Sequence, residues 1–418
     1  MKRTFLLTVM LLSAFLTGIA QTIYVDADAT GNNDGSSWQD AYTNLSQAID
    51  AAESGNEIWV AAGVYYPTSQ PNYEIGSANK RFDHFTLKNG VTLYGGFAGD
   101  ETGLHQRDLD ANKSVLSGDI DRNDNVEGEG YVANHTGVNG ENSLKLFYFP
   151  EGSTIDTTAV LDGFVLTAAV ANNDVYPYMG GAAFQCSDAS PKVVNCEFYG
   201  NYAKGDGGAI WINQSSMVIE NCTFSGNYAE DHGGAVFFEN TSASLNECTF
   251  TNNTSKFGGA VYIADGEETS VLENSVFDNN KTLENGNGGG ISISNANVYM
   301  KNTSFINNTA DSWGGGVVFH ASCDVDMVNC TVNSNYAGSW GGGIGTAVAD
   351  DQQRVKVRIT NSRIQGNEAG KNYGGGIALA SHSECKIYNS LISGNKIPVK
   401  STNYGGGAVT VENTSSFE

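Results

Sequence analysis

The second half of the chain repeats a short pattern of small, apolar and variable positions. A Gly-Gly pair recurs from Gly180-Gly181 to Gly406-Gly407, and apolar residues alternate with variable ones after each pair. Such alternation is typical of a β-strand with one buried face. The first apolar column comprises Ile210, Val236, Val261, Ile291, Val317, Ile344, Ile377 and Val409, and the second comprises Ile212, Phe238, Ile263, Ile293, Phe319, Thr346, Leu379 and Val411. We expect both columns to point inward and the residue between them to point outward.

A second signal, Phe-x-x-Asn, lies between successive Gly-Gly pairs. It begins at Phe198, Phe224, Phe250, Phe277 and Phe305, and later copies keep the Asn but begin with Val332, Ile364 and Ile392. The period of about 25 to 33 residues is too short for a propeller blade, and no segment is long enough for a helical repeat. Three short strands per turn, stacked at about 4.8 Å, would make one coil of a β-helix. The sequence therefore predicts an all-β protein, a right-handed parallel β-helix (solenoid) of about nine imperfect repeats.

Two further columns precede each Phe-x-x-Asn motif. The first is Asn195, Asn221, Asn274, Asn302, Asn329, Asn361 and Asn389, with Glu247 interrupting it. Repeated Asn at one coil position favours a ladder of side-chain amides. The next position holds Cys196, Cys222, Cys248, Ser275, Thr303, Cys330, Ser362 and Ser390. Because only small residues occupy it, we expect the cysteines to be stacked core residues rather than disulfides or metal ligands.

The paired Gly-Gly-Ala-Ile and Phe-x-x-Asn motifs resemble the repeats of the chlamydial polymorphic outer-membrane proteins. They are also similar to the larger set of bacterial right-handed β-helix repeat proteins, over residues 180–411. The resemblance implies a surface-exposed or secreted protein, often adhesive, with a C-terminal anchoring or sorting domain. This chain stops just after a new coil begins, so we expect either a fragment that lacks such a domain or a last coil covered by another domain or subunit.

Residues 1–20 are predicted to be a signal peptide. Lys2 and Arg3 precede a short apolar stretch, and Gly18-Ile19-Ala20 supplies the small residues of a cleavage site. Residues 21–68 are predicted to form an N-terminal cap of strand, helix and strand, with the helix capped by Ser37 and ending at Ala52. Residues 69–179 should form irregular N-terminal coils with loops. Residues 180–418 should form the regular repeats, truncated at the C-terminus.

Composition narrows the choice of partners. The chain has 51 Gly but only 6 Pro, which favours many tight turns over disorder. Its net charge of −24 argues against nucleic acid and anionic membranes, and less strongly against polyanionic glycans. No apolar run is long enough for a transmembrane helix. We therefore expect an exported protein of the extracellular space or outer-membrane surface, with the periplasm as the alternative.

Outward aromatic residues are the leading candidates for ligand binding. Trp211, Phe237 and Tyr262 occupy the outward strand position in three consecutive coils, and Phe257, Trp313, Trp340 and Tyr373 precede the glycines in a second column. Aromatic strips can stack on sugar rings or anchor a protein partner. The alternative is that these rings pack under a loop or support neighbouring strands.

An acidic loop offers a candidate metal site. Asp119, Asp121, Asn123 and Asp124 begin like a calcium-binding loop. The pattern departs at its sixth position, where Asp124 replaces Gly, and at its twelfth, where Gly130 replaces Glu. Calcium is therefore the one cofactor that the sequence suggests. The alternative is that these residues form an acidic, solvated loop.

Two charged clusters bear on catalysis. Arg354, Lys356 and Arg358 could form the basic cluster of a polysaccharide lyase, but aligning the coils places Asp324 beside Lys356, Asp326 beside Arg358, and Glu384 and Lys386 on the other side. We interpret them as inter-coil charge pairs. Asp206 and Asp231, one coil apart, could form a glycosidase pair, although such residues are commonly turn formers.

These observations favour a binding, adhesion or structural module over an enzyme, with no catalytic residue assigned. The expected partner is a glycan or a host or cell-surface protein. The alternative is a secreted polysaccharide lyase or glycoside hydrolase on a β-helix scaffold.

Overall fold

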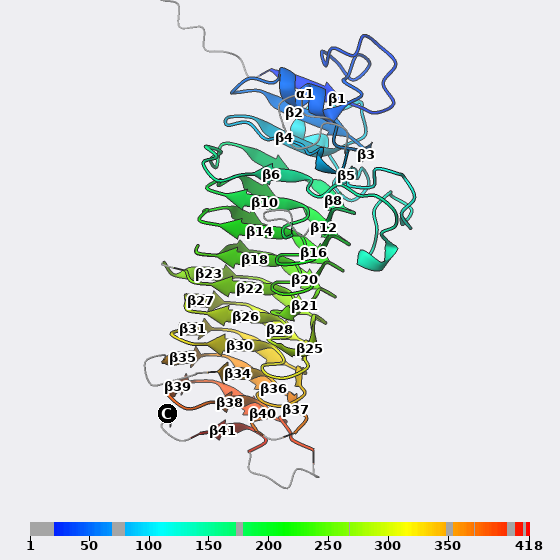
Figure 1. Ribbon diagram of the computed structural model, residues 1–418. Helices are drawn as coiled ribbons and strands as arrows, with labels where there is room; N and C mark the ends of the chain where they lie inside the picture. The colour runs from blue at the N-terminus through cyan, green and yellow to red at the C-terminus, as the bar shows by residue number, and fades with distance from the viewer. Residues whose placement is uncertain are drawn as a thin grey trace, which may run out of the picture.

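The computed structural model describes residues 21–68, 80–172, 179–266, 268–347, 354–371, 373–398, 406–412 and 415–418. Over these residues the chain forms one long stack of coils, with the N-terminal end at the top of Figure 1 and the C-terminal end at the bottom. Four sheets run along the stack, and neighbouring strands within each sheet are parallel. The predicted signal peptide lies outside the described residues.

The sheets, which we call A to D, contain the following strands. Sheet A comprises β1 (Thr22–Val25), β2 (Glu57–Ala61), β4 (Thr92–Phe97), β7 (Val160–Asp162), β11 (Lys192–Val194), β15 (Val218–Glu220), β19 (Ser244–Asn246), β23 (Ser270–Glu273), β27 (Asn297–Lys301), β31 (Asp324–Val328), β35 (Val355–Thr360), β39 (Ser383–Tyr388) and β42 (Ser416–Phe417). Sheet B comprises β3 (Gly63–Tyr65), β5 (Ser114–Ser117), β8 (Phe164–Thr167), β12 (Glu197–Tyr199), β16 (Thr223–Ser225), β20 (Thr249–Thr251), β24 (Val276–Asp278), β28 (Ser304–Ile306), β32 (Thr331–Asn333), β36 (Arg363–Gln365) and β40 (Leu391–Ser393). Sheet C comprises β6 (Phe147–Phe149), β10 (Phe184–Ser187), β14 (Ile210–Asn213), β18 (Val236–Glu239), β22 (Val261–Ala264), β26 (Ile291–Ser294), β30 (Val317–His320), β34 (Ile344–Ala347), β38 (Ile377–Leu379) and β41 (Val409–Val411). Sheet D comprises β9 (Val170–Ala171), β13 (Tyr202–Ala203), β17 (Tyr228–Ala229), β21 (Thr254–Phe257), β25 (Lys281–Asn287), β29 (Thr309–Ala310), β33 (Tyr336–Ala337) and β37 (Glu368–Ala369).

Each regular coil takes one strand from each sheet in the order C, A, B and D. The chain runs from β14 through β15, β16 and β17, and β18 then pairs with β14 one coil later. We expected three strands per turn, and the structure adds a fourth. Most sheet D strands are only two residues long, so the alternation of apolar and polar positions gave no signal for them.

The predicted core columns lie directly over one another. Ile210 pairs with Val236, and Val236 pairs with Val261, all fully buried. The Phe residues of the second motif form a parallel stack, with ring centroids 4.6 Å apart between Phe198 and Phe224 and 4.8 Å between Phe224 and Phe250. Such stacking adds to the burial of apolar area that stabilises the coils.

The Asn of Phe-x-x-Asn lies inside the fold, at the corner between sheets B and D. Asn227 donates through Nδ2 to Oδ1 of Asn253 at 3.0 Å and to the carbonyl oxygen of Phe198 at 2.9 Å. The backbone N–H of Asn227 also donates to Oδ1 of Asn253, at 3.1 Å. The same pattern continues from Asn201 to Asn395, so each buried amide has its polar atoms satisfied by its neighbours.

The other Asn column forms the corner between sheets A and B. These residues have positive φ, for example 50° at Asn221 and 53° at Asn274, a backbone conformation that Asn tolerates well. The predicted amide ladder is present along part of the column, since Asn221 donates to Asn195 at 2.7 Å and Asn302 to Asn274 at 3.0 Å. Where Glu247 interrupts the column, Asn274 donates instead to Asn246.

The Gly-Gly pairs form the corner between sheets D and C, and each glycine has its own reason. Gly233 has a φ of +59°, in the left-handed region. A Cβ on Gly234 would lie 2.1 Å from the carbonyl oxygen of Gly259 in the next coil. Stacking at strand spacing therefore excludes a side chain at the second position.

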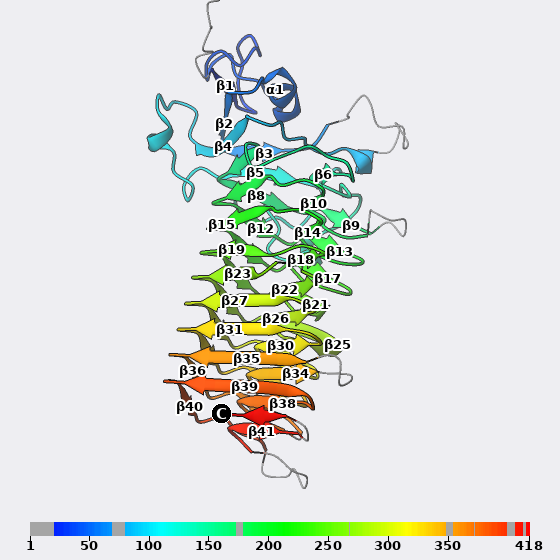
Figure 2. The same ribbon diagram turned by 90° about the vertical axis from the view of Figure 1, so that its left-hand side faces the viewer.

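The N-terminal cap differs in detail from the prediction. Helix α1 (Leu45–Ala51) begins later than expected, because Asn44 rather than Ser37 is its N-cap and accepts a hydrogen bond from Gln47 N–H. The single strand expected over 57–66 is divided into β2 and β3, which belong to different sheets. Helix α1 packs its apolar face onto β1 and β2 at the end of the stack (Figures 1 and 2).

A long excursion between β5 and β6 leaves the stack and folds back onto later coils. It contains η3 (His135–Gly137), and two other short 3-10 helices, η1 (Lys80–Phe82) and η2 (Leu104–Gln106), lie in earlier loops. Tyr131 stacks on Tyr199 at 4.6 Å, and His135 packs on Tyr228 at 4.3 Å. The excursion therefore spans two coils (Figure 1).

Candidate functional site

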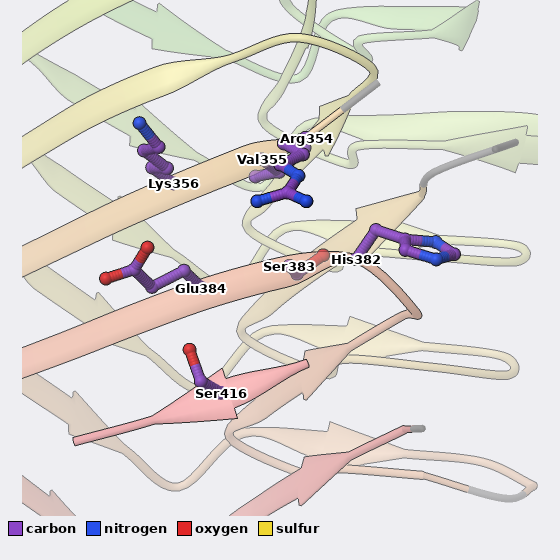
Figure 3. Close-up of a pocket in the computed structure, with 7 residues that line it drawn as sticks. All are labelled: Arg354, Val355, Lys356, His382, Ser383, Glu384 and Ser416. Carbon is purple, nitrogen blue, oxygen red and sulfur yellow. The ribbon is translucent and has the colours of Figure 1, made fainter. Parts of the chain in front are cut away.

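A surface pocket of about 340 Å³ lies on sheet A near the C-terminal end of the stack. Three successive strands bring its lining residues together, as Figure 3 shows: Arg354, Val355, Lys356, His382, Ser383, Glu384 and Ser416. Alternation buries Val355 in the core, while Lys356 stays exposed and Glu384 half-buried on the outer face. The pocket therefore combines two cations, the imidazole of His382, one carboxylate and the hydroxyl of Ser416, while the Ser383 hydroxyl is buried against Thr346.

The predicted register of this region is found. Of the expected charge pairs Arg358–Asp326 forms, whereas Lys356 pairs with neither Asp324 nor Glu384 among the described residues. Asp324 lies beside Lys356 and Asp326 beside Arg358, and on the other side Lys356 lies beside Glu384. Arg358 nevertheless binds both aspartates, through Nη2 to Asp324 and through Nε to Asp326, each at 2.5 Å. Its planar guanidinium reaches two acceptors at once, which a lysine ammonium does less well. These contacts raise the pKa of Arg358.

Glu384 forms an ion pair with Lys386 rather than with Lys356. Lys386 contacts Glu384 at 3.2 Å and Glu418 at 3.2 Å, and these contacts raise the pKa of Lys386. In Figure 3 the ammonium group of Lys356 points away from the Glu384 carboxylate. Among the residues that the structure describes, neither Lys356 nor Arg354 forms an ion pair.

The residues before each Gly-Gly pair form a continuous pre-glycine column: Asp206, His232, Phe257, Asn287, Trp313, Trp340 and Tyr373. Backbone bonds hold it in register, since Gly233 donates to the carbonyl of Phe257 and Gly314 to that of Trp340. Trp313 and Trp340 stack with centroids 5.5 Å apart, and Trp340 and Tyr373 lie 4.4 Å apart at a tilt of 57°. All three rings are half-buried, so part of each faces solvent.

The other predicted aromatic strip is not on the surface. Trp211, Phe237 and Tyr262 do lie over one another in sheet C, as expected. Trp211 and Phe237, however, are only 7% and 5% exposed, and Tyr262 is half-buried against them. Their outward direction was predicted correctly, but they form no exposed stripe, because the pre-glycine column and its corners cover the outer face of sheet C. The alternative, that these rings pack under a neighbouring segment and support one another, is the one that the structure bears out.

Close contacts between the pre-glycine corner and the outward residues show this second layer. His232 stacks on Phe237 at 5.6 Å, and a Cβ on Gly314 would lie 2.7 Å from the Cβ of Val318. In the first coil the outward residue is Trp211 and the pre-glycine residue Asp206, whereas in the next two coils both positions hold rings, as with His232 and Phe237. Farther along, Trp340 stands in the coil whose outward residue is Gly345, and Tyr373 in the coil of Ala378.

A polar cluster lies where the two layers meet. The carboxylate of Asp206 contacts Nδ1 of His232 at 2.7 Å, and Trp211 donates its indole N–H to Glu239 at 3.1 Å. Burial raises the pKa of Glu239, although the Trp211 bond opposes that shift. Nearby on the same face, burial lowers the pKa of His320 to about 4. The partner of Asp206 is thus His232. Asp231, with which Asp206 could have formed a glycosidase pair, lies exposed.

The acidic loop uses its carboxylates on its own backbone. Asp119 accepts from the N–H groups of Asn123 and Asp124, each at 3.1 Å. Asp121 accepts from Glu141 N–H, and Asp124 accepts from the Asn142 side chain. In the described part of the chain, no group of three or more His, Cys, Asp or Glu residues is placed to hold a metal. These carboxylates therefore accept hydrogen bonds within the loop, and calcium binding at this loop stays a prediction.

The seven cysteines are all buried and unpaired with one another. Cys196, Cys222 and Cys248 stack in the predicted small slot, and each thiol donates to a backbone carbonyl. Burial raises the pKa of these thiols, which keeps them protonated and poor nucleophiles. Within the described residues no helix has the length and apolar character needed to span a membrane.

Comparison with known proteins places this architecture. The model of the right handed beta helix region matches residues 158–287 and 280–417. The chain therefore belongs to the right-handed β-helix family, which confirms the predicted fold class. The chlamydial resemblance, in contrast, is supported only at this coarser level.

Comparison with individual proteins adds little to what the family match shows. Among solved structures the chain is similar to a rhamnogalacturonan lyase, with 10% identity over 96% of this chain and 87% of that chain and a TM-score of 0.35. It is also similar to the pectate lyase Pel9A, with 11% identity over 94% of this chain and 82% of that chain and a TM-score of 0.35. Likeness at this level carries no inference about activity. No curated protein matches the sequence.

Proposed function

We propose that this protein is an exported, non-catalytic binding module of the extracellular space or cell surface. The observation that carries the proposal is the row of half-buried rings of Trp313, Trp340 and Tyr373, one per coil. A rigid scaffold that presents aromatic residues at strand spacing suits an extended ligand that runs along the stack. The leader-like residues 1–20 and the resemblance to surface-exposed repeat proteins support export.

The chemistry of the row favours a glycan as the ligand. The indole N–H groups of Trp313 and Trp340 donate to no residue that the structure describes, so they are available to hydroxyl groups. The tilt of 57° between Trp340 and Tyr373 leaves part of a ring face open. Ring faces and N–H donors together match the apolar faces and hydroxyl edges of sugar rings.

Binding to a glycan array, combined with Trp340→Ala, tests this proposal. The variant should weaken binding at least about 10-fold, because truncating a buried aromatic anchor commonly costs more than about 1.4 kcal/mol. Tyr299→Ala is the matched control, since Tyr299 is a half-buried aromatic on the outer face of sheet A. Glycan binding that survives Trp340→Ala, or an equal loss in Tyr299→Ala, would contradict the proposal. Binding only to a surface protein would replace the glycan with that partner.

Polysaccharide cleavage is the second candidate, and one observation favours it. The Asp206–His232 pair is a carboxylate-oriented imidazole, and Glu239, whose pKa is raised, belongs to the same cluster. A reducing-sugar assay with His232→Asn separates the two functions. Release of new ends by the wild type that the variant abolishes would establish cleavage, whereas binding without release supports the binding module.

A further inference from the structure

We propose that the pocket of Arg354 and Lys356 binds the anionic group of a hydroxyl-bearing ligand, such as an acidic or sulfated sugar. This site lies on sheet A, away from the pre-glycine column at the corner between sheets D and C. It therefore does not depend on the binding function proposed for Trp313, Trp340 and Tyr373.

The acidic residues beside Lys356 are paired with other cations. The chain has 46 Asp and Glu residues but only 22 Lys and Arg, so an available carboxylate would be expected near any cation. Lys356 has Asp324 on one side and Glu384 on the other. Arg358 and Lys386 bind these two acids, and Lys356 is left with no ion pair among the described residues.

Arg354 lies beside Lys356 in the wall of the pocket. It lies two residues before Lys356, on the same outward side of the chain by strand alternation. Both side chains are exposed and both line the pocket, as Figure 3 shows. Two cations on one wall provide several N–H donors for a carboxylate or a sulfate ester.

A carboxylate and a hydroxyl group face the two cations across the pocket. Glu384 and Ser416 line the opposite part of the pocket, on the two following strands. A carboxylate in the pocket repels a bare polyanion but accepts hydrogen bonds from hydroxyl groups. The lining therefore fits a ligand that carries one anionic group together with hydroxyls.

The size of the pocket limits the size of the ligand. A volume of about 340 Å³ lies at the lower end of small-molecule sites, enough for about one sugar unit. The net charge of −24 would oppose the approach of an anion, but screening confines that repulsion to about 8–10 Å at physiological salt. The cations of the pocket therefore act on a ligand at closer range than the net charge of the whole chain does.

Calorimetric titration of the full chain with three disaccharides tests the proposal: one bearing a uronate, one bearing a sulfate ester and one neutral. We expect binding of at least one anionic disaccharide and no detectable binding of the neutral one. Lys356→Gln and Arg354→Gln should each weaken it about 10-fold, the usual effect of losing a charge-assisted hydrogen bond. Both side chains are exposed, so folding should be unaffected, which circular dichroism checks.

Lys301→Gln is the control, because it removes one half-buried cation, paired with Glu273, from sheet A outside the pocket. Trp340→Ala should also leave binding of the disaccharide unchanged, which separates this site from the proposed function. Equal binding of neutral and anionic disaccharides, an equal loss in Lys301→Gln, or no binding of either anionic disaccharide would overturn the proposal. The uronate and sulfate arms distinguish the two sources of the anionic group.

Discussion

At the scale of single residues, the buried Asn column explains why each Phe-x-x-Asn motif keeps its Asn. Asn253 accepts two hydrogen bonds from Asn227 and donates to both Asn280 and the carbonyl of Phe224. The donors and acceptors are all buried, and each would cost free energy if left without a partner. Asp in place of Asn could not donate, and Gln would not fit the same spacing.

Asn253→Ala should therefore lower the free energy of unfolding by about 3 kcal/mol, because it leaves several buried groups unsatisfied. Asn274→Ala, at the exposed corner, should cost only about 1 kcal/mol, since water can replace its lost bonds and only the preference for positive φ is affected. Urea unfolding of the two variants measures the difference. Equal losses would mean that the buried column has no special role.

His320 provides a residue-scale prediction about pH. Burial lowers its pKa from 6.5 to about 4, so the folded protein favours the neutral imidazole. Its contribution to stability is complete above the unfolded pKa near 6.5 and is lost as the pH falls toward 4. The loss should approach at most about 1.4 kcal/mol per pH unit in that window. His320→Gln should flatten the curve of unfolding free energy between pH 6.5 and 4, and an unchanged slope would contradict this account.

At the scale of elements, the columns could be predicted because strand alternation and coil stacking act locally. The register of Asp324, Lys356 and Glu384 follows from counting residues from the Asn column, and it was right. The Arg358–Asp326 pair was predicted with that register. What could not be predicted was that Arg358 would also bind Asp324 and that Lys386 would bind Glu384, since both depend on side-chain reach. The start of α1 was also missed, because Ser37 and Asn44 are both acceptable N-caps by sequence and only tertiary packing chooses between them.

The layer over sheet C is the other element-scale feature hidden from the sequence. Alternation gives the direction of Trp211 but not whether anything covers it. The cover comes from the pre-glycine corner, of the same coil for His232 over Phe237 and of the preceding coil for Gly181 beside Trp211. The repeat pattern marks that corner only as Gly-Gly. Exposure of a predicted outward column is therefore a tertiary property.

This layer predicts different costs for two tryptophans. Trp211→Ala should destabilise the protein by about 3 kcal/mol or more, because the side chain is 7% exposed and its removal leaves a cavity. Trp340→Ala should cost only about 1 kcal/mol, since its ring is half-buried. Thermal unfolding of both variants checks the order. The reverse order would place Trp340, rather than Trp211, beneath the layer.

At the scale of the whole molecule, the stack is a one-dimensional array with most contacts between neighbouring coils. The excursion around Tyr131 and His135 departs from this rule, since it packs on β12 and β17 in successive coils. Gly200 and Gly226 permit its close approach, because a Cβ on either would lie less than 3 Å from excursion atoms. The excursion should therefore couple the unfolding of the first regular coils, which a nearest-neighbour array would otherwise lose one at a time.

The charge of the whole stack decides how salt acts on it. Ion pairs such as Arg358–Asp326 and Lys301–Glu273 lie on the surface, where each contributes about 0–1 kcal/mol and is weakened by salt. Opposing them is the mutual repulsion of a chain with a net charge of −24, which salt also screens. Because acidic residues outnumber basic ones 46 to 22, repulsion should dominate. Raising sodium chloride from 0.02 to 0.5 M (roughly a fivefold shorter Debye length) should therefore increase the melting temperature. A decrease would show that the inter-coil ion pairs, rather than net repulsion, control the stability of the stack.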